Sequence, residues 1–91
     1  LDPTARRVWV REIEVELTRT EFDLLEALTG RANAALSRRQ LVDTVWGSDW
    51  VGDEHLVDVH IGHLRRKLAA VADLAFVDTI RGVGYRMGSG R

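Results

Sequence analysis

The 91-residue sequence predicts one α+β domain in which two short strands come first, three helices follow and a β-hairpin closes the chain. Three observations predict this order. Apolar and polar residues alternate over residues 7–17, two capping-box motifs begin runs of helical spacing, and a late run carries two glycines between β-rich segments. A chain of this length buries one core with a modest stability margin, so we expect a single domain over residues 1–91.

The composition is that of a folded domain, with 45% hydrophobic and 30% charged residues. Cysteine is absent, which excludes disulfides, thiolate zinc sites and cysteine nucleophiles and agrees with a cytoplasmic location. No apolar run approaches the roughly 18 to 20 residues that span a bilayer, so no membrane partner is predicted. Because the chain begins with Leu1 rather than Met, we expect it to be a fragment of a longer protein.

The charge is distributed unevenly along the chain. The net charge of −1 argues against a nucleic-acid partner, because such domains usually carry a basic excess. Residues 1–54 hold seven basic and eleven acidic residues, a net of −4, whereas residues 55–91 hold six and three, a net of +3. The second segment is therefore suited to face an anion.

The first predicted elements are two antiparallel strands within residues 7–17. The alternation of apolar and polar residues holds to Val10 and resumes at Ile13, so its phase breaks at Arg11-Glu12. A turn at this point joins the two strands, although it lacks the Gly or Asn that such hairpins usually carry.

Two capping boxes predict the first two helices. In each box a hydroxyl accepts a hydrogen bond from the backbone N–H three residues later, whose own side chain bonds back to the cap. The box over residues 18–21 begins a helix that we expect Gly30 to end in a left-handed cap. The box over residues 37–40 begins a second, short helix that Gly47 closes.

The third helix is predicted from residue 55 to Leu68, after a loop over residues 48–54 in which Asp53 is a suitable N-cap. Four apolar residues recur in it at positions i, i+4, i+7 and i+11, and they form one narrow stripe. These residues are Val57, Ile61, Leu64 and Leu68. The sequence therefore predicts that this stripe is buried.

The opposite face of this helix is unusual for a solvent-exposed surface. It consists of His55, Val59, Gly62 and Arg66, flanked by Asp58, His63 and Arg65. Val and Gly lower helix propensity and add no solubility. A helix in a DNA major groove needs such residues near the base edges, with Arg or His as donors, so we expect Val59 to contact a thymine methyl and Arg65 or Arg66 to reach guanine or phosphate. The alternatives are a helix that packs on another protein and one half-buried on both faces.

Neither a metal site nor an enzyme site is predicted. Of the three histidines, only His60 and His63 share a helix face, and no carboxylate or cysteine stands at ligand spacing from them. Solvated or phosphate-directed imidazoles are the better interpretation. Ser37 and Thr79 have no His or Asp arranged in a nucleophile motif, so no catalytic residue is expected.

The three tryptophans have different predicted roles. Trp9 on the first strand and Trp46 at the end of the second helix are expected to pack against the core or its edge. Trp50 stands in a polar loop, and an aromatic held in a surface loop is often a partner contact.

The glycine pair in RGVGYR (residues 81–86) resembles part of a phosphate-binding loop. The third glycine and the following helix of a dinucleotide fingerprint are missing, so no cofactor is predicted. The pair instead indicates a hairpin tip at which Gly82 and Gly84 both supply positive φ. Arg81 beside this tip has a shape suited to a DNA minor groove.

Four segments together resemble the successive signatures of the OmpR/PhoB-type winged-helix DNA-binding domain of bacterial response regulators. They are LTRTEFDLLEAL (17–28), LSRRQLVDTVWG (36–47), LVDVHIGHLRRKL (56–68) and TIRGVGYR (79–86). The resemblance implies a winged helix-turn-helix with a four-stranded N-terminal sheet, a three-helix core with a recognition helix, and a C-terminal hairpin wing. It implies sequence-specific binding of double-stranded promoter DNA for transcriptional regulation. It also implies an N-terminal receiver domain that a sensor kinase phosphorylates in a two-component phosphorelay.

The resemblance also implies which residues contact DNA. On the recognition helix these are His55, Leu56, Asp58, Val59, Gly62, His63 and Arg65. Elsewhere Arg38 and Trp46 are implied near the phosphate backbone, Thr79 and Tyr85 as phosphate contacts, and Arg81 as the wing arginine of the minor groove. The loop over residues 47–53 corresponds to a segment that meets RNA polymerase in several relatives, with Trp50 as the candidate contact.

The recognition helix departs from the family at several positions. Residues 55, 62 and 63, often basic or polar in relatives, are His, Gly and His, and Leu56 replaces a frequent hydroxyl residue. We therefore expect weak affinity for one half-site and useful binding only when two copies occupy adjacent half-sites as a dimer on DNA. The alternative function is a winged-helix protein-interaction module with little independent DNA binding.

Overall fold

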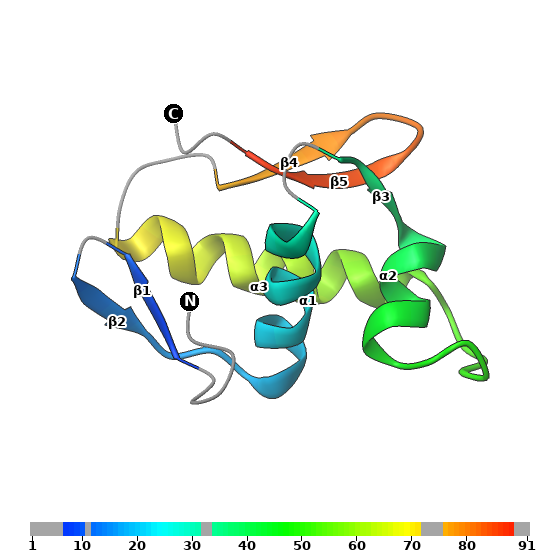
Figure 1. The fold of residues 1–91 in the computed structure, drawn as a ribbon, viewed down its shortest axis with the longest axis horizontal. Helices are drawn as coiled ribbons and strands as arrows, with labels where there is room; N and C mark the ends of the chain where they lie inside the picture. Colours follow the sequence, from blue (N-terminus) through cyan, green and yellow to red (C-terminus); the bar gives the residue numbers. More distant parts are fainter. Residues whose placement is uncertain (1–6, 11, 32–33, 72–75, 89–91) are drawn as a thin grey trace.

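Three helices pack with two small antiparallel sheets, and the structure, a computed structural model, describes residues 7–10, 12–31, 34–71 and 76–88. In chain order these residues form β1 (Val8–Val10), β2 (Ile13–Val15), α1 (Arg19–Gly30), β3 (Leu36–Ser37), α2 (Arg38–Val45), α3 (His55–Val71), β4 (Val77–Ile80) and β5 (Gly84–Met87). The predicted order of strands, three helices and hairpin is confirmed. In Figure 1, β1 and β2 lie at one end of α3, whereas β3, β4 and β5 lie along one side of the helices.

The N-terminal hairpin turns where the alternation of the sequence changes phase. Val8 lies opposite Val15 and Val10 opposite Ile13, which confirms two antiparallel strands. Glu12 has a φ of 69°, the left-handed conformation that Gly or Asn usually supplies in such turns. Of the four N-terminal strands that the family resemblance implies, two lie in the described residues, and residues 1–6 lie outside them.

Glu12→Asn is expected to raise the free energy of unfolding by about 0.5 to 1 kcal/mol, because Asn tolerates the left-handed region better than Glu does. Urea unfolding of both proteins measures the difference. Glu16→Asn is the matched control, because Glu16 is also exposed and has no positive φ. An equal gain in the control would contradict the assignment of strain to Glu12.

Both capping boxes are present as predicted. The N–H of Glu21 donates to Thr18 Oγ1 at 3.2 Å, and the N–H of Thr18 donates to Glu21 Oε1 at 2.9 Å. The N–H of Gln40 donates to Ser37 Oγ at 3.1 Å, and the N–H of Ser37 donates to Gln40 Oε1 at 2.8 Å. These bonds fix where α1 and α2 begin.

Two of the three predicted signals at the ends of the helices are confirmed. Gly47 follows α2 with a φ of 101°, and Asp53 Oδ1 accepts a hydrogen bond from the N–H of His55 at 2.8 Å, as an N-cap does. The prediction for Gly30 is wrong. Gly30 is the last helical residue of α1 and has no positive φ, and Arg31 caps the helix with a φ of −127°.

The predicted stripe of α3 forms the centre of the core, since each of its four residues is at most 2% exposed. Residues from α1, α2 and both sheets surround it: Val8, Val10, Val15, Phe22, Leu24, Leu25, Leu28, Leu36, Leu41, Val42, Val77 and Tyr85. The core therefore holds α3 by one face and leaves the other at the surface. Among the described helices, none has the length and apolar character that crossing a bilayer requires.

The C-terminal sheet has the order β3-β5-β4, and the short strand β3 was not predicted. The N–H of Val83 donates to the carbonyl of Ile80 at 2.9 Å, and Gly82 has a φ of 78° within this turn, as predicted. Gly84 needs to be glycine for a different reason than predicted. Its φ is not positive, but a Cβ at Gly84 would lie 2.0 Å from the carbonyl oxygen of Leu36 on β3.

Candidate nucleic-acid interface

The exposed face of α3 has an apolar and small centre. Leu56 is 42% exposed and Val59 is 41% exposed, and a Cβ at Gly62 would meet no atom within 4 Å. His55 and Arg66 are exposed beside them. The structure therefore brings together the four residues that the helical period predicted and places Leu56, which only the family resemblance implied, beside them.

One flank of this face is hydrogen-bonded to α2 and to the hairpin of β4 and β5, which we call the wing. Asp58 Oδ1 accepts hydrogen bonds from Arg38 Nε at 2.7 Å and from the hydroxyl of Tyr85. Its other oxygen, Oδ2, lies 3.0 Å from Nδ1 of His55. Because both carboxylate oxygens have partners, Asp58 joins α3 to α2 and to β5.

The ionisation of this group follows from the same contacts. Burial acts to raise the pKa of Asp58, but the hydrogen bonds from Tyr85 and Arg38 outweigh it and lower the pKa below its ordinary value. Burial, with the hydrogen bond to Asp58, raises the pKa of Tyr85. The hydrogen bond to Asp58 raises the pKa of Arg38. At neutral pH, Asp58 is therefore an anion that is hydrogen-bonded to the neutral phenol of Tyr85 and to the cationic guanidinium of Arg38.

Arg65 extends this arrangement along the wing. Its Nε donates to the carbonyl of Val77 at 3.1 Å, and its NH2 nitrogen donates to Thr79 Oγ1 at 2.6 Å. The guanidinium carbons of Arg65 and Arg38 each lie 5.3 Å from the centre of the Tyr85 ring. We call Arg38, Asp58, Arg65, Thr79 and Tyr85 the wing joint. All five were predicted as DNA contacts, and the structure shows that they bind one another.

Tyr85→Phe is expected to lower the free energy of unfolding by about 1 to 2 kcal/mol at pH 7, because a buried hydroxyl that donates to a carboxylate is lost. The lowered pKa of Asp58 means that this stability is present at neutral pH and is lost as pH falls below about 4. Urea unfolding at pH 7 and pH 3 measures the change.

Thr79→Val is the matched control, because it removes a hydroxyl that Arg65 contacts without touching a carboxylate. Its effect is expected to be similar at both pH values. A deficit in Tyr85→Phe that stays the same at pH 3 would contradict the coupling to Asp58.

The other flank of α3 begins with an aromatic cluster. The ring of His60 lies 5.8 Å from that of Trp46, and the ring of Trp46 lies 5.6 Å from that of Trp50. Both tryptophans are half-buried against the core, as predicted for Trp46 but not for Trp50. The neighbouring Val51, which the sequence did not single out, is 95% exposed. Trp9 on β1 is 42% exposed, and the guanidinium of Arg7 lies over its ring.

A buried carboxylate on α1 holds the same flank further along the helix. Glu21 is 2% exposed, and its Oε1 accepts from Lys67 Nζ at 2.6 Å, while its Oε2 lies 4.0 Å from His63 Nδ1. Burial acts to raise the pKa of Glu21, but the hydrogen bonds from Lys67 and Thr18 lower it overall. The sequence predicted Glu21 only as part of a capping box, because nothing local relates it to Lys67.

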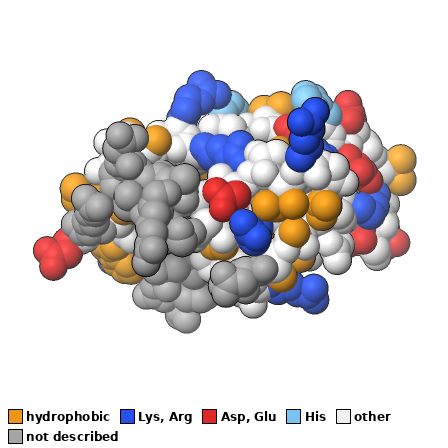
Figure 2. All heavy atoms as spheres, turned by 90° about the horizontal axis from the view of Figure 1, so that it is seen from above, with side chains coloured by type: hydrophobic (Ala, Val, Ile, Leu, Met, Phe, Trp, Pro, Cys, Tyr) orange, Lys and Arg blue, Asp and Glu red, His pale blue; other side chains and the backbone are white. Residues whose placement is uncertain are grey.

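Two arginines near this face remain unpaired. Arg66 on α3 and Arg81 in the turn between β4 and β5 make no ion pair or side-chain hydrogen bond with other described residues. Arg39, by contrast, pairs with Asp43 at 2.6 Å and Glu54 at 3.5 Å. In Figure 2, Lys, Arg and His side chains lie along the upper edge of the view among hydrophobic and acidic ones. Arg66 and Arg81 are therefore available to an anionic partner.

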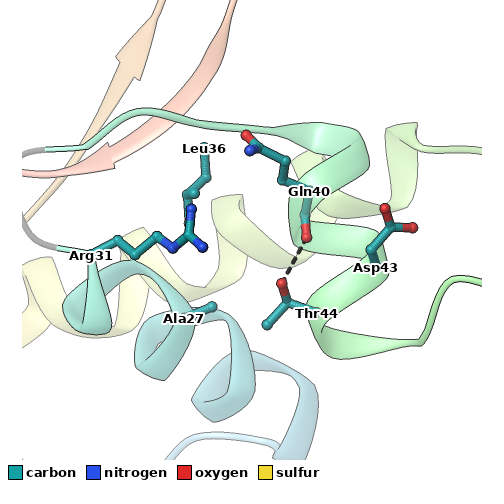
Figure 3. Close-up of a pocket in the computed structure, with 6 residues that line it drawn as sticks. All are labelled: Ala27, Arg31, Leu36, Gln40, Asp43 and Thr44. Carbon is teal, nitrogen blue, oxygen red and sulfur yellow. Dashed lines mark hydrogen bonds between the residues drawn. The ribbon is translucent and has the colours of Figure 1, made fainter.

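A groove of about 210 Å³ between α1 and α2 lies apart from this face (Figure 3). Its described lining residues are Ala27, Arg31, Leu36, Gln40, Asp43 and Thr44. None of them belongs to α3. Within the described part of the chain, no group of three or more His, Cys, Asp or Glu residues is placed to hold a metal ion.

Known proteins of one family are similar to this chain in fold and in sequence. Residues 12–87 match the family described as "Transcriptional regulatory protein, C terminal". The transcriptional regulatory protein PrrA of Mycobacterium tuberculosis is 47% identical over 85 residues, which cover 93% of this chain and 36% of PrrA. The chain thus spans little more than a third of the length of this relative.

Two solved structures of DNA-binding domains show the same architecture over nearly their whole length. The DNA-binding domain of CpxR from E. coli is 36% identical with a TM-score of 0.83, and the match covers all of this chain and 90% of that one. The DNA-binding domain of the response regulator AdeR, in complex with an intercistronic region, is 28% identical with a TM-score of 0.86, and the match covers 98% and 92% of the two chains. The chain therefore belongs to the family of C-terminal domains of transcriptional regulatory proteins, the OmpR/PhoB-type winged-helix domains of response regulators.

Proposed function

We propose that this chain binds double-stranded promoter DNA sequence-specifically and regulates transcription as the output domain of a two-component response regulator. The observation that carries the proposal is the exposed face of α3, which has an apolar centre and an unpaired Arg66, beside a wing that presents Arg81. In this arrangement α3 enters the major groove and the turn of the wing reaches the adjacent minor groove. The AdeR domain in complex with an intercistronic region supports the proposal.

The proposed DNA-binding residues fall into three groups. His55, Leu56, Val59, Gly62, His63 and Arg66 face the major groove on α3. The wing joint and Trp46 lie towards the phosphate backbone, where Asp58 acts by holding Arg38 and Tyr85 in place. Arg81 contacts the minor groove. Contacts to the phosphates give affinity, and contacts to the bases give specificity.

The larger protein is proposed to carry further functions. The chain spans 36% of PrrA, which leaves room for a receiver domain that a sensor kinase phosphorylates. Two copies on adjacent half-sites provide the affinity that one recognition helix with few charges does not. The loop that contains Trp50 and Val51 is the proposed contact with RNA polymerase. The protein acts in the cytoplasm.

In vitro selection on random duplexes tests the proposal. The 91-residue chain is expected to enrich one sequence and to prefer it over a scrambled duplex of equal length. Affinity for the selected duplex is expected to fall steeply with salt, with a slope of about −0.9 in log–log form for each phosphate contact. Failure to enrich any sequence, or a flat salt dependence, would contradict the proposal.

A second candidate function is protein interaction without useful DNA binding. The net charge of −1 and the almost fully exposed Val51 favour it. A stable complex with a polymerase subunit or a receiver domain, together with no enriched DNA sequence, would support this function over the first.

Arg81→Ala is expected to weaken binding to the selected duplex by on the order of tenfold and to remove any preference for A/T-rich sequence beside the core site. A narrow A/T-rich minor groove attracts an unpaired guanidinium, and Arg81 is exposed at the turn of the wing. Arg86→Ala is the matched control, because Arg86 lies on β5 and pairs with Asp78 at 3.7 Å. Equal losses of affinity in both variants, or an unchanged footprint on DNA with Arg81→Ala, would contradict the assignment of Arg81 to the minor groove.

A further inference from the structure

Two large aliphatic side chains lie next to each other on the exposed face of α3. Leu56 and Val59 are each about two-fifths exposed, and neither belongs to the buried core. Residues three apart are neighbours on a helix surface, and they lie about 4.5 Å apart along its axis. This separation is close to the roughly 3.4 Å between successive bases of one DNA strand. The pair is therefore spaced to meet two neighbouring bases.

Two polar side chains beside this pair, Asp58 and Arg65, already have hydrogen-bond partners within the protein. Both oxygens of Asp58 have partners in the protein, and Arg65 donates to Val77 and Thr79. Asp58 is thus poorly placed to accept from cytosine, and Arg65 to donate to guanine. Leu56 and Val59 therefore give this part of the face an exposed aliphatic surface, next to the exposed ring of His55.

The missing side chain at Gly62 adds to the same effect. A Cβ there would meet nothing within 4 Å, so the core does not require glycine at this position. Its absence lets the backbone of α3 approach a partner more closely next to Val59. A close approach strengthens short-range contacts between aliphatic groups.

We propose that Leu56 is a specificity-determining residue that reads the methyl group of a thymine adjacent to the base contacted by Val59. The thymine methyl is the one apolar group that the four bases present in the major groove. The inference rests on the proposed DNA binding and deepens it, because it names the bases that this chain selects. It predicts two neighbouring thymines in the preferred site.

The test removes one methyl group at a time from the DNA. The duplex that the chain selects from random DNA is remade with deoxyuridine in place of each thymine in turn, and each affinity is measured. Replacement at two neighbouring positions is expected to weaken binding about fourfold each, as the loss of one buried methyl group predicts. Leu56→Ala is expected to abolish the sensitivity at one position, and Val59→Ala at the other.

Ile13→Ala is the matched control, because it shortens an exposed aliphatic side chain on β2, outside α3, and is expected to keep both sensitivities. The thermal midpoint of Leu56→Ala is expected to match that of the parent chain. A selected site without neighbouring thymines, indifference to deoxyuridine, or sensitivities unchanged by Leu56→Ala would overturn the inference while leaving DNA binding intact. Failure to select any duplex would instead overturn the proposed function.

Discussion

Val59→Glu is expected to abolish selective DNA binding while the fold remains intact. Val59 lies at the centre of the exposed face of α3, opposite the buried stripe. A carboxylate there would lose an apolar contact with the bases and would place a negative charge close to the phosphates. Like charges opposed across an interface cost several kcal/mol, so the affinity should fall by at least about a hundredfold.

The same substitution should leave stability nearly unchanged. Val59 is not part of the core, and Glu has a higher helix propensity than Val, so the thermal midpoint is expected to stay the same or rise slightly. Val51→Glu is the matched control, because it makes the same change in charge at an exposed site outside α3. If Val59→Glu kept its selectivity for the duplex, the placement of α3 in the major groove would be contradicted. An equal loss of affinity in Val51→Glu would show that the effect comes from net charge alone.

Signals confined to a few residues predicted the helices well. The capping boxes at Thr18 and Ser37 and the stripe of α3 depend on contacts within about one helical turn, and sequence spacing shows such contacts directly. Strand β3 was missed for the opposite reason. It has two residues and exists because Leu36 and Ser37 pair with Tyr85 and Gly84, which are far away in the sequence.

The candidate site shows the same division. The helical period predicted which side of α3 is exposed, whereas the wing joint depends on contacts among residues from α2, α3, β4 and β5. The family resemblance implied each of its members as a DNA contact, and no sequence signal indicated that Asp58 would bind Arg38 and Tyr85. The packing of Trp50 against the core was not predicted, because its loop has no period from which burial could be inferred.

Gly84→Ala is expected to lower the free energy of unfolding by about 2 to 3 kcal/mol, the cost of forcing an atom into a packed site. The added Cβ would lie 2.0 Å from the carbonyl oxygen of Leu36 and 2.8 Å from the Cα of Ser37. These are backbone atoms, so β3 must move away from β5. Because Tyr85 follows on the same strand and belongs to the wing joint, affinity for the selected duplex should fall as well.

Alanine substitutions at two other glycines, Gly82 and Gly62, allow the cost at Gly84 to be compared with costs that have other physical causes. Gly82→Ala is expected to cost about 1 kcal/mol, because φ is 78° there but the surrounding space is open. Gly62→Ala is expected to stabilise the chain by about 0.5 to 1 kcal/mol, because the site is helical and a Cβ meets no atom. Urea unfolding of the three variants measures this order. If Gly84→Ala were no more costly than Gly82→Ala, the pairing of β3 with β5 would not hold the wing in place. Alanine at these three glycines thus separates the effects of steric contact, backbone strain and helix propensity on stability.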